Sequence, residues 1–167
     1  PEIARDGEWL PAEAGAFAAD YEGKLAGLDA AGMLEAIRRY ERIQTVSGRI
    51  MSYAGLRYSQ NTTDPVRGKF YGDRQAELTD ASAPLVFFTL ELNRIDDAAL
   101  AALLAADPGL ARYKPVLDRV RAMKPYQLSD ELERFLHDQS VVGASAWNRL
   151  FDETLAGLEF DVLGETR

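Results

Sequence analysis

Apolar residues recur at helical spacing in the first part of the chain, with polar residues between them. Phe17, Tyr21, Leu25 and Leu28 follow one another at steps of four, four and three residues, which places them on one side of a helix. Proline is well tolerated as a first helical residue. We therefore expect a helix that runs from Pro11 to about Leu28.

A second and longer apolar stripe follows. Asp29 can accept hydrogen bonds from the first turn of a helix, and no proline interrupts the chain from there to about Ser59. The expected helix, residues 30–59, is much longer than an average helix. Its stripe comprises Leu34, Ile37, Tyr40, Ile43, Ile50, Tyr53 and Tyr58.

The next boundary is the turn Asn61–Pro65, in which Asp64 can cap a helix that Pro65 begins. We expect this third helix to reach about Asn93, with a kink at Pro84 because proline cannot donate a backbone hydrogen bond. Residues 85–92 are almost continuously apolar, so periodicity alone permits a buried helix or a strand. A helix is favoured because no partner strand is visible. The helix pair forms a long antiparallel hairpin.

Four shorter helices are expected in the remainder of the chain. They cover residues 97–106 (capped by Asp96 or Asp97), 110–123, 130–139 (capped by Ser129) and 145–157. The buried positions expected in the first three are Leu117, Val120, Leu132, Phe135 and Leu136, and the last helix carries Trp147, Leu150, Phe151, Leu155 and Leu158. The pattern predicts an all-α, multi-helix array at residues 1–157 and the start of a strand or hairpin at residues 158–167.

Small residues line both arms of the predicted hairpin. Gly48, Ser52, Gly55 and Ser59 lie on one face of the second helix, and Gly68, Gly72 and Ala76 lie on one face of the third. Each helical glycine costs about 1 kcal/mol relative to alanine, so the pattern needs a reason. The first interpretation is unusually close packing of the two helices. The alternative is a groove in which the backbone of a ligand approaches.

Composition excludes several classes of function. The chain of 167 residues has 27 acidic and 19 basic residues and a formal charge of -8, which disfavours nucleic-acid partners and anionic membrane surfaces. It has no cysteine and one histidine, too few ligands for a common zinc or di-iron site. The longest apolar run has nine residues, against about 20 for a membrane span. The N-terminal residues lack the features of a signal peptide, so a cytoplasmic location is expected.

No residue is predicted to be catalytic, to bind a cofactor or to hold a metal. His137 is expected at a solvent edge, away from any nucleophile. The acidic pairs Asp96–Asp97 and Asp130–Glu131 suit helix N-termini, whereas Asp152–Glu153 lies within a helix and is expected to be partly buried. The other charged and aromatic groups have structural interpretations: solvated faces for Arg38, Arg39, Arg42, Arg119, Arg121 and Lys124, and core positions for Phe70, Tyr71, Phe87 and Phe88.

Several blocks together resemble the N-terminal region of the oligoendopeptidase F family of zinc metallopeptidases. They are Tyr21–Leu25, Asn61–Pro65, Lys69–Tyr71, Phe87–Ile95, Leu128–Glu133 and Ala146–Thr154, and they span nearly the whole chain in the family's order. The resemblance implies a largely helical protein whose helices enclose a channel for peptides. It also implies that residues 1–157 are a helical N-terminal domain and that residues 158–167 lead to a C-terminal catalytic domain, in which His-Glu-x-x-His and a later Glu bind zinc.

The chain contains no His-Glu-x-x-His, so no catalytic or zinc residue can be transferred onto it. By this resemblance, the chain is the N-terminal helical part of a peptidase of oligopeptides, forms a wall or lid of the substrate channel and is inactive alone. Its expected partners are the C-terminal catalytic domain and, in the whole protein, oligopeptides. The alternative is a free-standing helical module that binds a partner protein.

Overall fold

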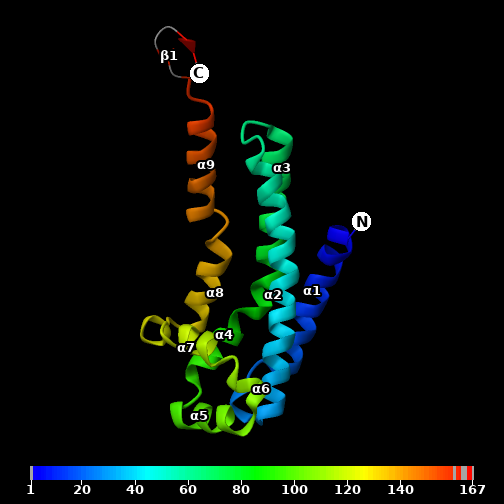
Figure 1. The fold of residues 1–167 in the computed structure, drawn as a ribbon, viewed down its shortest axis with the longest axis vertical. Coiled ribbons are helices and arrows are strands. Elements are labelled where there is room, and N and C mark those ends of the chain that lie inside the picture. Colours follow the sequence, from blue (N-terminus) through cyan, green and yellow to red (C-terminus); the bar gives the residue numbers. More distant parts are fainter. Residues whose placement is uncertain (1, 160, 163–164, 167) are drawn as a thin grey trace.

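The computed structural model describes residues 2–159, 161–162 and 165–166, and it is the all-α array that the sequence predicts. In chain order its elements are α1 (Glu2–Tyr21), η1 (Leu25–Gly27), α2 (Ala30–Ser59), α3 (Pro65–Ser82), η2 (Ala83–Leu85), α4 (Val86–Arg94), α5 (Asp97–Ala106), α6 (Pro108–Ala111), α7 (Lys114–Arg121), η3 (Lys124–Tyr126), α8 (Asp130–Gln139), α9 (Ala144–Ala156), β1 (Asp161–Val162) and β2 (Glu165–Thr166), where η denotes a 3-10 helix. Helices α1, α2 and α3 lie side by side, and α8 and α9 form a second column beside α3 (Figure 1).

The first helix is longer at its start and shorter at its end than predicted. It includes Pro11 in its interior and already places Leu10 in the core, 2% exposed. It ends at Tyr21 because Gly23 takes a positive φ of 77° that a helix cannot contain. Lys24 closes this end, since its ammonium donates to the carbonyl oxygens of Ala19 and Asp20 at 2.8 and 2.9 Å.

The long antiparallel hairpin is confirmed, with both predicted caps. Asp29 accepts from the Gly32 N–H at 2.8 Å at the start of α2, and Asp64 accepts from the Val66 N–H at 2.9 Å at the start of α3. Of the α2 stripe, Tyr53 does not reach the core and is 46% exposed. The hairpin therefore follows from local capping chemistry and from a mostly correct apolar stripe.

The break at Pro84 is confirmed, and residues 85–92 are helical except for the 3-10 turn that ends at Leu85. This break directs Phe87 and Phe88 into the core, where they are 3% and 2% exposed. Phe88 stacks on Tyr40 with ring centroids 4.4 Å apart and meets Phe17 edge-on at 5.2 Å. The core thus lies where α1, α2 and α4 meet, and Phe17 at its centre has no exposed surface.

The short helices differ from the expected pattern in one place. Helix α5 and its Asp96 cap are as predicted, but residues 110–123 do not form one helix. Asp107 caps α6, and a new helix, α7, begins after Tyr113 with Pro115 in its first turn. A proline suits a first turn and disfavours the middle of a helix, which explains the division. Leu117 is buried as expected.

The last two helices have the predicted positions, but α8 does not have the predicted burial. Ser129 caps α8, and α9 begins one residue before the expected start. The side chains expected to be buried in α8 are instead about half exposed: Leu132 50%, Phe135 56% and Leu136 52%. Beyond α9 the expected strand is two short antiparallel strands that pair Asp161 with Thr166 and Val162 with Glu165. Residues 160, 163–164 and 167, which the prediction also covered, lie outside the described residues.

The close packing expected of the small-residue faces is not observed. A Cβ atom built on Gly48 would meet nothing within 4 Å, and one built on Gly55 would meet only the Tyr71 ring, at 3.9 Å. Aromatic side chains contribute to the contact of the two helices here, since Tyr58 stacks on Tyr71 with ring centroids 5.1 Å apart. Phe70 and Tyr71, expected in the core, are half-buried in this contact. The glycines therefore leave open surface rather than a tight seam.

Candidate functional site

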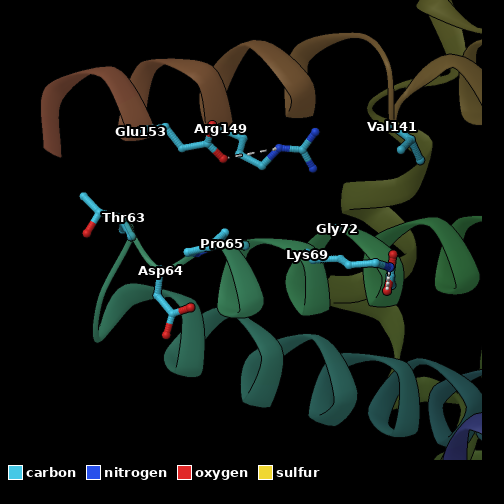
Figure 2. Close-up of a pocket in the computed structure, with 11 residues that line it drawn as sticks. Thr63, Asp64, Pro65, Lys69, Gly72, Val141, Arg149 and Glu153 are labelled. Atoms are coloured by element: carbon cyan, nitrogen blue, oxygen red, sulfur yellow. Dashed lines mark hydrogen bonds and ion pairs between the residues drawn. The ribbon is translucent and has the colours of Figure 1, made fainter. Parts of the chain in front are cut away.

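An open groove separates α9 from the α2–α3 hairpin. Its larger part has a volume of about 760 Å³ and is lined by Thr62, Thr63, Asp64, Pro65, Gly68, Lys69, Gly72, Asp73, Val141, Arg149 and Glu153. A smaller part of about 440 Å³ shares Thr62 and Arg149 with it and adds Gly55, Tyr58, Ser59, Tyr71, Gln75, Ser145, Asn148, Asp152 and Leu155. Figure 2 shows Arg149 and Glu153 on one side, from α9, and Pro65, Lys69 and Gly72 on the other, from α3.

Two glycines shape the α3 side of this groove. A Cβ atom on Gly72 would lie 2.8 Å from Nη1 of Arg149, and one on Gly68 would lie 3.9 Å from Oε1 of Glu153. The small-residue face of α3 is therefore turned toward α9 and not only toward α2. This arrangement favours the alternative interpretation of that face, a groove with exposed backbone, over close helix packing.

The charges that line the groove are partly neutralised by their own neighbours. Lys69 pairs with Asp73 at 2.6 Å, one turn along α3. Nε of Arg149 lies 3.9 Å from Oε1 of Glu153, a loose ion pair with no hydrogen bond. Asp64 serves the helix cap: hydrogen bonding by the Val66 N–H is the main reason that its pKa lies below the usual 3.8. Arg149 is thus the least constrained cation of the groove.

Tyr58 is the most unusual residue of the groove. Its side chain is 5% exposed, yet its hydroxyl has no hydrogen-bond partner among the described residues. A buried hydroxyl without a partner is costly. Burial raises the pKa of Tyr58, and the nearby carboxylates of Glu153 and Asp152 raise it further. The phenol is therefore neutral at physiological pH and is a hydrogen-bond donor with unused capacity beside the groove.

His137 does not lie at a solvent edge as expected. It is half-buried, with Nε2 3.0 Å from the Thr79 carbonyl oxygen and 3.2 Å from Oγ of Ser82. Its position on α8 lets the ring reach back to the end of α3. The residue thus joins two helices, which the sequence pattern could not indicate because the partner lies 55 residues away.

The carboxylate pairs have mainly structural roles. Asp96 caps α5 and Asp97 pairs with Arg121, while Asp130 at the start of α8 pairs with Arg94. The last pair, Asp152 and Glu153, is exposed rather than partly buried.

Two of the basic residues expected on solvated faces are anchored. Arg39 joins α2 to α1 through Glu13, at 2.5 Å, and Asp20, at 2.6 Å. Arg121 binds the backbone at the end of α4, donating to the carbonyl oxygens of Leu92 and Ile95. These contacts fix the relative positions of helices, and a pattern of charges along one helix cannot reveal them.

The zinc implied by the family resemblance does not fit the described residues. Within residues 2–159, 161–162 and 165–166, no three His, Cys, Asp or Glu side chains are grouped so that they could hold a metal ion. The same part of the chain has no helix that is both long and apolar enough to cross a bilayer.

Three comparisons with known proteins agree. Residues 91–160 match the family model described as Oligopeptidase F. The chain is 26% identical over 132 residues to oligopeptidase PepF of Bacillus subtilis (strain 168), a match that covers 77% of this chain and 19% of that protein. Its fold matches the crystal structure of oligoendopeptidase-F from Enterococcus faecium with a TM-score of 0.79 and 20% identity, over 99% of this chain and 33% of the other. Each of the three comparisons thus finds a similarity to an oligopeptidase F or oligoendopeptidase F.

The chain spans between about a fifth and a third of the length of these two proteins. Within the oligoendopeptidase F resemblance, the block Ala146–Thr154 contains Arg149 and Glu153 on α9, and the block Asn61–Pro65 forms the far end of the same groove. Sequence reasoning identified both blocks but did not place them together. Tyr58 was missed, because it was counted as one more residue of an apolar stripe.

Proposed function

We propose that this chain is the N-terminal helical part of a zinc-dependent oligopeptide peptidase of the oligoendopeptidase F type. In this proposal it forms one wall or lid of the channel that admits peptides, and the zinc and the catalytic residues belong to another part of that protein. The observation that carries the proposal is the agreement of the family model and the curated relative on the same family. The matching fold is consistent with it.

The groove between α9 and α3 is the part of this wall best suited to meet a peptide. Extended peptides carry backbone N–H and C=O groups that need partners, and Gly68 and Gly72 let such a backbone approach closely. Tyr58 offers a hydroxyl without a partner, and Arg149 is held only loosely by Glu153. These groups can bind and orient a peptide, and none of them is placed to activate water.

An activity assay tests the proposal that catalysis belongs to another part of the protein. We expect the purified chain to cleave an internally quenched peptide of about ten residues no faster than buffer does, with or without added zinc, because general-base and metal catalysis require groups that the described residues do not assemble. Zinc-dependent turnover by the chain alone would overturn the proposal.

A binding assay tests the groove. Fluorescence polarisation of a labelled peptide should show weak binding to the chain, and Arg149→Ala should reduce it. Arg119→Ala is the matched control, because it removes the same charge from an exposed position on α7. If the two variants reduce peptide binding equally, the groove is not the peptide-binding surface. The proposal that the chain is part of a peptidase is not affected by that result.

A further inference from the structure

Helix α9 turns most of its polar side chains toward the rest of the structure and most of its large apolar side chains away. Ser145, Asn148, Arg149 and Asp152 line the groove that faces the α2–α3 hairpin, and Leu155 lines it with them. On the other side of the helix lie Trp147, Leu150 and Phe151, named here the outer stripe, which are 69%, 52% and 62% exposed. At 3.6 residues per turn, the outer stripe and the groove residues fall on opposite sides of the helix.

This orientation is the reverse of the usual one. A helix at the surface of a globular protein buries its apolar side and exposes its polar side. Here none of the residues of α9 is buried, and α8 repeats the pattern with three apolar side chains that are about half exposed. Clusters of large exposed apolar side chains mark surfaces that another structure covers.

We propose that the outer stripe is the surface on which the C-terminal remainder of an oligoendopeptidase F-type peptidase packs. This inference rests on the proposed function. The relatives indicate what covers the outer stripe. The chain matches only 19% of one relative and 33% of the other, so both proteins contain much more structure that could pack on it. Two parts of one polypeptide also meet at a high effective concentration, which favours such a contact.

The charge of the chain argues against a second copy of the same chain as the occupant. Each copy carries a formal charge of -8, so self-association brings like charges together. Docking on the outer stripe also leaves the opposite side of α9 free. The groove with Tyr58 and Arg149 stays open to a peptide while α9 is held in place from behind.

Hydroxyl-radical footprinting read by mass spectrometry tests the proposal. The isolated chain is compared with the full protein encoded by the reading frame that contains it. Labelling of Trp147 and Phe151 should fall at least about fivefold in the longer protein, because side chains at the centre of an interface lose most of their contact with solvent. Low labelling of Phe17, which is fully buried, shows in each sample that the helical core is folded.

The possible results separate the two proposals. A reading frame that encodes no further domain overturns the proposed function and this inference with it. A longer peptidase in which Trp147 and Phe151 stay fully labelled overturns only this inference. Protection that develops in the isolated chain when its concentration is raised assigns the stripe to a second copy and also overturns it.

A pair of variants of the longer protein adds a matched control. Phe151→Asp places a charge in the outer stripe and should restore the labelling of Trp147 to the level of the isolated chain. Leu56→Asp makes the same kind of change at a side chain of α2 that is 72% exposed, and it should leave Trp147 protected. Equal labelling of Trp147 in the two variants contradicts the proposal.

Discussion

Arg121 holds the short helices of the molecule together, and its removal should be costly. Its guanidinium donates to the carbonyl oxygens of Leu92 at 2.6 Å and Ile95 at 2.7 Å, at the end of α4. These carbonyls belong to the last turn of a helix, where no intrahelical N–H is available to them. The side chain is only 12% exposed, so water competes poorly for both bonds.

The size of the effect follows from these contacts. A hydrogen bond to a charged group contributes about 1.5–3 kcal/mol, and the two part-buried bonds to the Leu92 and Ile95 carbonyl oxygens give an expected loss of about 3 kcal/mol. The ion pair with Asp97 adds little, because that carboxylate is 86% exposed. Arg121→Met keeps most of the aliphatic packing and removes only the polar contacts. The stability that it loses is therefore the contribution of these contacts.

Urea denaturation followed by circular dichroism measures the loss directly. In a domain of this size, about 3 kcal/mol corresponds to a fall in Tm of about 6–12 °C. Arg119→Met is the control, since it removes the same charge from the exposed side of α7. Arg121→Lys should fall between the wild type and Arg121→Met, because an ammonium cannot span both carbonyls as the guanidinium does. If Arg121→Met and Arg119→Met lose equal stability, the capping role is wrong.

Other substitutions test separate parts of the structure. Gly48→Ala should raise the free energy of unfolding by about 0.5–1 kcal/mol, and Gly55→Leu should change it by less than about 1 kcal/mol. The reason is that neither position meets a close neighbour. If urea denaturation shows that either variant loses several kcal/mol of stability, the close-packing hypothesis is restored. Glu91→Ala should cost about 2 kcal/mol and speed hydrogen exchange of the turn after α1, whose N–H groups this carboxylate accepts at 2.7 and 3.4 Å. The hydrogen bond from Arg94 lowers the pKa of Asp130 below 3.8. The ionised Asp130 carboxylate therefore stabilises the fold above pH 3.8, and this stabilisation is lost as the pH falls through the lowered pKa. Asp130→Asn should make the fall in Tm below pH 4 less steep.

The helix starts were predictable because capping is local chemistry. Asp29, Asp64, Asp96 and Ser129 all accept backbone N–H groups two or three residues ahead in the sequence, so the signal and its partner lie in one short window. Helix type and approximate bounds follow from such windows. The start of α1 was wrong for the same reason: a proline that suits a first turn was taken as the first residue, although the helix continues before it.

Burial was less predictable, because it depends on what a helix packs against. Most of the apolar side of α2 was identified correctly, since α1 packs on it and Phe88 of α4 stacks on Tyr40, although Tyr53 is exposed. The same reasoning failed for α8, whose apolar side chains remain about half exposed. Amphipathic spacing shows which side of a helix is apolar but not whether the cover belongs to the same folded unit. The hydroxyl of Tyr58 illustrates the related limit that an unsatisfied group is visible only once its surroundings are known.

The blocks that carry the family resemblance explain why it predicts the fold better than the chemistry. Glu91, in the block Phe87–Ile95, accepts a hydrogen bond from the backbone of Gly23, in the block Tyr21–Leu25. Arg94, in the same block, pairs with Asp130 in the block Leu128–Glu133. Segments far apart in the sequence are therefore matched because they hold one another in place. In such a scaffold the resemblance reports which helices meet. Three blocks instead face an open groove, at the turn before α3, on α3 and on α9, and function should first be sought in them.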